Sequence, residues 1–143
     1  MLVCLINECS FVSSFQGMWF IQSLVSSLFA VLFLQSGIDK ITDRKGNLEW
    51  LTGHFASSPL AGFVTLLLTT LTIVEIAAGA ISLVGVAFIL ISKTYCLAFA
   101  GTALSGIALV MLFFGQRLAK DYAGAASLIP YFILAVIDLY FLA

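Results

Sequence analysis

Two acidic residues inside otherwise apolar segments are the side chains best placed to do chemistry in this sequence. Glu75 lies 16 residues beyond Pro59, and Asp138 lies 17 residues beyond Asp121. If both segments are helices that rise about 1.5 Å per residue, both carboxyl groups lie about 24 Å from the same side. A charged carboxylate is costly in lipid, so we expect both acids to face the interior of a helical bundle.

Helix counting places neutral polar residues near the same level. Equal counts along the two antiparallel segments reach Gln22 in the first and the neighbourhood of Thr102 in the third. We therefore predict that Glu75 and Asp138 face one another and share a proton, with Gln22 as a further partner. The predicted intramembrane polar cluster consists of Gln22, Ser26, Glu75, Thr102 and Asp138.

Three roles for this cluster stay open. Its hydrogen bonds could hold the helices in register, as polar groups do in small membrane bundles. It could instead relay protons or bind a ligand such as a quinone head group, or it could contact a partner subunit.

A second polar cluster lies at the ends of the apolar segments. Its charges would anchor the helices among lipid head groups or would bind an anionic lipid or another acidic head group. The members of this cluster are Asp39, Lys40, Gln116, Arg117, Lys120 and Asp121.

Histidine and cysteine give little support for a metal site or a catalytic centre. His54 is the only histidine, and Cys4, Cys9 and Cys96 form neither a CxxC motif nor a Cys/His motif. We therefore interpret His54 as a hydrogen-bonding residue at the membrane interface and the cysteines as unpaired thiols. A Cys4–Cys9 disulfide would require an extracytoplasmic N-terminus. We predict no metal and identify no catalytic residue.

Composition places these polar residues in a membrane protein. Of the 143 residues, 62% are hydrophobic and 9% are charged, against roughly 25% charged residues in a soluble domain. Most of the surface must therefore face lipid. The net charge of −1 and the absence of any Lys/Arg run exclude nucleic-acid binding.

Hydropathy divides the chain into four apolar segments. They run from about 19 to 38, from Pro59 to between 83 and 91, from 95 to 114, and from 122 to the C-terminus. Because about 20 helical residues cross the hydrocarbon core, we predict an all-α polytopic protein with a bundle of four transmembrane helices. Residues 18–143 form one domain. Residues 1–17 are an N-terminal extension, which would be disordered if Met18 were the natural start.

The loop between the first two segments has a pattern of its own. Asn47 is a candidate helix cap before Leu48, and Trp50 suits the depth of the head groups. We expect a short interfacial helix in this loop.

The basic residues favour one orientation. Five of them lie in the first and third loops, and only Lys93 lies in the second. The positive-inside rule therefore predicts that the first and third loops are cytoplasmic and that both termini are periplasmic or extracellular. The five residues are Lys40, Arg44, Lys45, Arg117 and Lys120.

Motifs in three of the segments carry a family resemblance. The first segment ends in Phe33–Lys40, the second contains Val74–Gly79 followed by Leu83–Gly85, and Gly115–Gly124 precedes the fourth. In order and spacing, these runs resemble the DoxX family of small membrane proteins from about Met18 onward. The resemblance implies a four-helix bundle in the bacterial cytoplasmic membrane. The family name derives from a subunit of a thiosulfate:quinone oxidoreductase, and members are associated with redox-stress complexes.

Two functions of different class follow. The chain could be an accessory subunit of a redox or quinone-linked membrane complex, with quinone as the only cofactor implied. It could instead be a non-catalytic scaffold or assembly subunit of a larger complex. Either function implies that the chain contacts the lipid bilayer and other membrane subunits or copies of itself.

Overall fold

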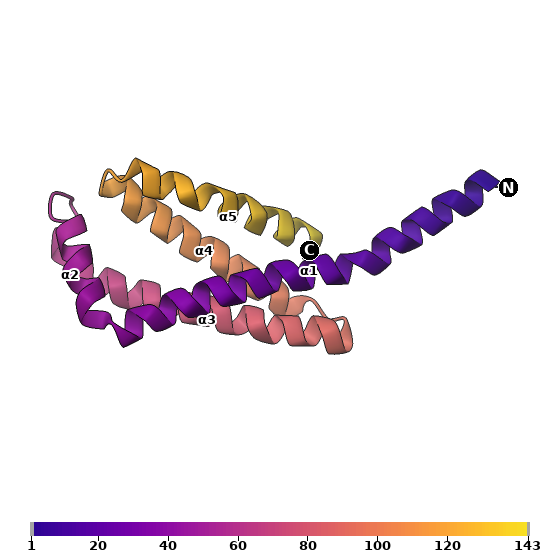
Figure 1. The fold of residues 1–143 in the computed structure, drawn as a ribbon, viewed down its shortest axis with the longest axis horizontal. Coiled ribbons are helices and arrows are strands. Elements are labelled where there is room, and N and C mark those ends of the chain that lie inside the picture. The colour runs from indigo at the N-terminus through magenta and orange to yellow at the C-terminus, as the bar shows by residue number, and fades with distance from the viewer. Residues whose placement is uncertain (1, 143) are drawn as a thin grey trace.

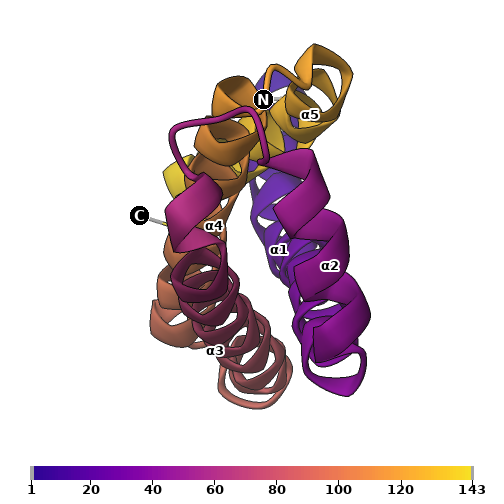
Figure 2. The same ribbon diagram turned by 90° about the vertical axis from the view of Figure 1, so that its left-hand side faces the viewer.

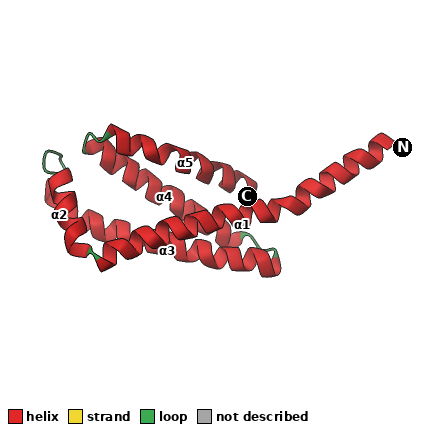
Figure 3. Cartoon of the chain, viewed as in Figure 1, coloured by secondary structure: helices red, strands yellow, loops and turns green. Residues whose placement is uncertain are grey.

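A computed structural model describes residues 2–142 of the chain and the side chains of residues 17–142. In this part the chain forms α1 (Leu2–Thr42), α2 (Arg44–His54), the 3-10 turn η1 (Ala61–Phe63), α3 (Val64–Ser92), α4 (Cys96–Leu118) and α5 (Tyr122–Leu142). Short loops join the helices, and no strand occurs among the residues described (Figure 3).

Four stretches of the described chain are long and apolar enough to cross a bilayer. They are Gly17–Thr42 in α1, Ala61–Ser92 across η1 and α3, Cys96–Leu118 in α4 and Tyr122–Leu142 in α5. Helices satisfy their own backbone hydrogen bonds, which is what the hydrocarbon region requires. The predicted all-α, four-span architecture is confirmed, and the chain is a multi-pass membrane protein.

The spans pack in chain order, with α3 between α1 and α4, and with α5 mainly against α4 (Figures 1 and 2). The N-terminal part of α1 projects beyond the bundle (Figure 1). We call the end that carries α2 and the α4–α5 turn the α2 end, and the opposite end, at the α3–α4 turn, the Lys93 end. These names carry no assignment to a side of the membrane.

Several helix boundaries differ from those expected. α1 starts at Leu2, so the helix of the first span begins earlier than the predicted residue 19. The second span starts later than predicted, because Ser58 and Pro59 lie in a turn in which the amide of Leu60 donates to Ser58 Oγ at 3.1 Å. The α-helix itself begins only at Val64.

The short helix α2 expected between the first two spans exists, but its cap is not Asn47. Asp43 is the N-cap, and its carboxylate accepts a hydrogen bond from the amide of Gly46 at 3.1 Å. Asn47 instead lies inside the helix and donates to the carbonyl of Asp43 at 2.8 Å. A carboxylate at this position also suits the positive end of the helix dipole.

Glycines allow α3 to approach both of its neighbours. A Cβ atom on Gly79 would lie 2.7 Å from the backbone nitrogen of Leu34 in α1, and one on Gly85 would lie 2.6 Å from that of Ala98 in α4. Small residues permit such close packing between transmembrane helices. These contacts fix the depth of each α3 side chain relative to α1 and α4.

Candidate functional site

The two buried acids do not lie at one level. Glu75 is eleven residues beyond Val64, whereas Asp138 is sixteen residues beyond Tyr122. At a rise of about 1.5 Å per residue, these positions are about 16 and 24 Å along their helices. The prediction of a shared level was wrong because it counted from Pro59, which precedes the helix.

Glu75 pairs with Lys40 of α1. Lys40 Nζ lies 2.9 Å from Glu75 Oε2, and the exposed fractions of the two side chains are 15% and 0%. Ser36 joins them, because its hydroxyl accepts from Lys40 Nζ at 2.6 Å and donates to Glu75 Oε1 at 3.3 Å. The result is a buried ion pair with a hydroxyl bridge.

Helix geometry explains why Lys40 points into the bundle. Side chains of an α-helix tilt toward its N-terminus, and for Lys40 at the end of α1 that direction leads back into the membrane. Its ammonium therefore passes over Ser36, one turn earlier, and also donates to the Ser36 carbonyl at 3.3 Å. The four-residue spacing of Ser36 and Lys40 indicates this contact. The prediction that assigned Lys40 to the polar cluster at the ends of the apolar segments missed it.

Asp138 has a different environment. Its Oδ2 accepts a hydrogen bond from Thr102 Oγ1 at 2.8 Å, and both residues are buried. One turn further along α5, the carbonyl of Phe141 accepts from Gln22 Nε2 at 2.9 Å. The predicted partners Gln22 and Thr102 thus lie near Asp138 rather than between two acids.

Helix register brings three buried serines to the same region. α1 and α5 are antiparallel, so the Gln22–Phe141 bond places Ser26, one turn along α1, level with Asp138. Ser82 of α3 packs against Gly101, which precedes Thr102, and Ser105 follows Thr102 by about one turn. Sequence reasoning missed Ser82 and Ser105. We call the following group the Asp138 layer: Gln22, Ser26, Ser82, Thr102, Ser105 and Asp138.

An apolar layer lies between the two acids. On α1, Phe29 and Phe33 fall between Ser26 and Ser36, and on α3, Ala78 falls between Glu75 and Ser82. These residues pack in one buried core with Ala108, Leu109 and Ala135. The predicted Glu75–Asp138 pair is therefore replaced by two separate polar sites, with partners Lys40 and Thr102 respectively.

A third polar group lies at the α2 end. His54 Nε2 is 2.8 Å from Gln116 Oε1 and 4.0 Å from Asp121 Oδ2, and the His54 ring stacks on Trp50 with centroids 4.6 Å apart. The expected hydrogen-bonding role of His54 is confirmed. Asp121 also caps α5, since its Oδ1 accepts from the amide of Gly124 at 2.8 Å.

The second predicted polar cluster, at the ends of the apolar segments, is only partly assembled. Gln116 and Asp121 meet at His54, whereas Lys40 turns inward to Glu75. Arg117 lies over the ring of Tyr122 at 4.8 Å. Within the part of the chain described, no side-chain hydrogen bond or ion pair joins the other two members, Asp39 and Lys120, to this group.

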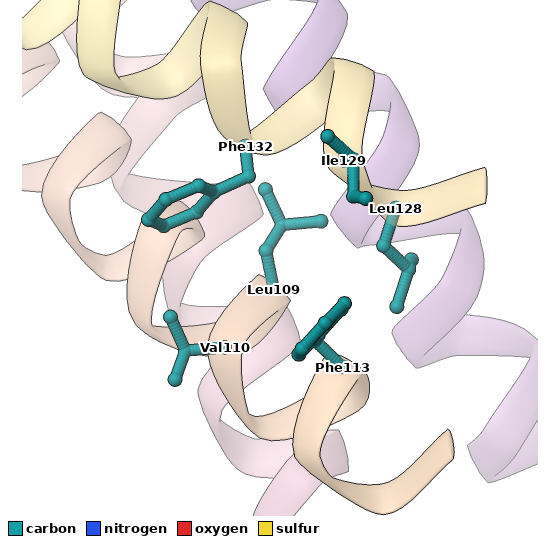
Figure 4. Close-up of a pocket in the computed structure, with 6 residues that line it drawn as sticks. All are labelled: Leu109, Val110, Phe113, Leu128, Ile129 and Phe132. Atoms are coloured by element: carbon teal, nitrogen blue, oxygen red, sulfur yellow. The ribbon is translucent and has the colours of Figure 1, made fainter. Parts of the chain in front are cut away.

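The His54 group borders a cavity of about 100 Å³ between α2, α3 and α4, which we call the Trp50 pocket. Trp50, His54 and Gln116 provide its polar and aromatic side, and Leu67, Leu71 and Met111 are among its apolar walls. A second cavity of about 230 Å³ lies between α4 and α5 and is lined by apolar side chains (Figure 4). Of these two cavities, the Trp50 pocket is the one that combines hydrogen-bonding groups with an apolar wall.

The described residues contain no group of three His, Cys, Asp or Glu side chains that could hold a metal ion. Cys96 is a free, exposed thiol. The disulfide considered for Cys4 and Cys9 lies outside the described side chains. Comparisons with protein-family models, with curated proteins and with solved structures each found no match for this chain.

The ion pair predicts a strong coupling between Lys40 and Glu75. The Lys40→Met variant should lose about 3–5 kcal/mol of unfolding free energy, because it leaves a buried carboxylate without its cation. Adding Glu75→Met should restore most of this loss. Unfolding in mixed detergent micelles measures Lys40→Met, Glu75→Met and the double variant, with Lys45→Met as the exposed control. Additive losses in the double variant, or a Lys40→Met loss no larger than that of the control, would contradict the pair.

Proposed function

We propose that this chain is a DoxX-like accessory subunit of a quinone-linked complex in the bacterial cytoplasmic membrane. The observation that carries the proposal is the Trp50 pocket, which joins an aromatic, hydrogen-bonding side to an apolar wall at one end of the spans. The order and spacing of the motifs that resemble the DoxX family point to the same class of function.

The side chains of the pocket suit the head group of a quinone. Trp50 and His54 are stacked and offer a flat surface to a planar ring. His54 and Gln116, which hydrogen-bond to one another, could turn their donors toward ring carbonyl oxygens. The cavity is smaller than the roughly 300–1,000 Å³ of pockets that enclose a whole ligand, so it would hold the ring while the tail stays among lipids.

A bound quinone would supply the electron transfer, which amino-acid side chains do not provide by themselves. The residues of this chain would orient the ring and exclude water around it. His54, at 4.0 Å from Asp121 Oδ2, is placed to hold or pass a proton at the ring edge. The electrons would come from or go to a partner subunit.

We place the α2 end in the cytoplasm, because five of the six basic residues lie there. Both termini would then lie on the other side of the membrane.

The orientation predicts a labelling pattern in intact cells. With the native cysteines replaced by alanine, Lys45→Cys should resist an impermeant thiol reagent and Thr94→Cys should react with it. Both positions are exposed, so the difference would report the side of the membrane. The reverse pattern would invert the assignment.

Quinone binding should be visible in the fluorescence of Trp50. The chain has two tryptophans, so Trp19→Phe leaves Trp50 as the only reporter. A short-chain ubiquinone should quench this variant saturably in lipid nanodiscs. Adding His54→Ala or Gln116→Ala should raise the half-saturating quinone concentration roughly tenfold, because the quinone loses a hydrogen bond.

The matched control is Trp50→Phe, in which Trp19 reports from the Lys93 end, beside Lys93 Nζ at 3.6 Å from its ring. This variant should show only non-saturable quenching by quinone dissolved in lipid. Equal quenching of the two reporters would remove the Trp50 pocket as a quinone site.

One observation favours the scaffold function instead. The buried residues of α5 are Ala125, Ala135 and Asp138, so most of this helix is free to contact another subunit. A stoichiometric, redox-silent partner that copurifies in mild detergent, together with no saturable quenching, would favour this alternative.

A further inference from the structure

The two buried acids differ in how their charge is balanced. Glu75 has the ammonium of Lys40 at 2.9 Å. For Asp138, the described contact is a neutral hydroxyl, that of Thr102, at 2.8 Å. Only 3% of Asp138 is exposed, so water does little to stabilise its charge. The Asp138 layer therefore lacks the one positive charge that the Glu75 site contains.

Hydroxyl groups in the Asp138 layer are also unusual. Hydroxyls outside the layer show the usual pattern: Ser23, Ser27 and Thr72 each donate to the carbonyl one turn earlier on their own helix, at 2.6–2.7 Å. Ser26, Ser82 and Ser105 are fully buried, yet their oxygens have no hydrogen-bond partner among the described residues. A buried polar atom without a partner costs free energy and calls for an explanation.

Gln22 shows the same feature at the edge of the layer. Its Nε2 donates to the Phe141 carbonyl, but its Oε1 is buried without a partner. The layer thus contains one carboxylate and four buried oxygens with unused lone pairs, contributed by α1, α3 and α4. Apart from Asp138, the members of this layer are amides and hydroxyls, so none of them is titratable.

Oxygen ligands of this kind suit a small hard cation. A single carboxylate balances a single positive charge, which favours a monovalent ion over a divalent one in a low-dielectric interior. Thr102 can keep its hydrogen bond to Asp138 and still offer a lone pair, because a hydroxyl has one donor and two acceptor sites.

We propose that the Asp138 layer is a sodium site, in which Asp138 supplies the charge and the surrounding hydroxyl and amide oxygens complete the coordination. A proton on Asp138 competes with the ion, because it neutralises the same carboxylate. The site is separate from the Trp50 pocket and does not depend on quinone binding.

The test is the thermal unfolding of the purified full-length chain in detergent. Sodium chloride should raise the unfolding midpoint relative to choline chloride at equal ionic strength, because an ion that binds only the folded state stabilises it. The rise should be larger at alkaline than at acidic pH, where protons occupy Asp138. Asp138→Asn should abolish the sodium response.

Control variants separate the site from a general salt effect. Glu75→Gln should keep the sodium response, since Glu75 has Lys40 as its cation. Ser105→Ala and Thr102→Val should each raise the half-saturating sodium concentration roughly tenfold, and they decide the matter if Asp138→Asn does not fold. Equal responses to sodium and choline in the unaltered chain, or an unchanged response in Asp138→Asn or in both ligand variants, would overturn the proposal.

Discussion

The ion pair between Lys40 and Glu75 is the interaction on which the rest of the bundle depends. A carboxylate with no exposed surface inside a membrane span requires a cation, and the end of α1 supplies one. Meeting this requirement fixes the register of α1 against α3, which the close contact of Gly79 with Leu34 then reinforces. With that register set, α2 follows α1 directly and lies beside α3, where Arg44 donates to Thr69 at 2.7 Å.

The apolar layer around Phe29 and Phe33 divides the interior into two polar sites. Toward the α2 end, Glu75 is neutralised by the protein itself. Toward the Lys93 end, Asp138 accepts a hydrogen bond from Thr102, and helix register places buried oxygens with unused lone pairs near its level. The first arrangement balances its own charge and suits a structural role. The second has no cation of its own among the described contacts and suits a site that takes one up. The pocket at Trp50 lies outside both.

Much of the fold could be predicted from the sequence, because the lipid environment permits few structures. Hydropathy located all four spans, and the pairing of Asp138 with Thr102 agrees with the helix counting that placed both in one cluster. Counting failed for Glu75, since the four residues after Pro59 form a turn and the 3-10 helix η1, and α3 begins only at Val64, five positions beyond Pro59. Five positions correspond to about 7.5 Å of α-helix. The sequence analysis also assigned Lys40 to the polar cluster at the ends of the apolar segments. The tilt of helical side chains toward the N-terminus instead directs its ammonium into the bundle.

The infrared spectrum of Glu75 would show directly whether this acid is an ionised partner of Lys40 inside the bundle. The difference spectrum between the unaltered chain and Glu75→Gln isolates the carboxyl absorption of Glu75. We expect the band lost to be that of an ionised carboxylate, and we expect Lys40→Met to convert it into a protonated carboxyl band. If the band lost is instead that of a protonated carboxyl group, Glu75 and Lys40 do not form an ion pair.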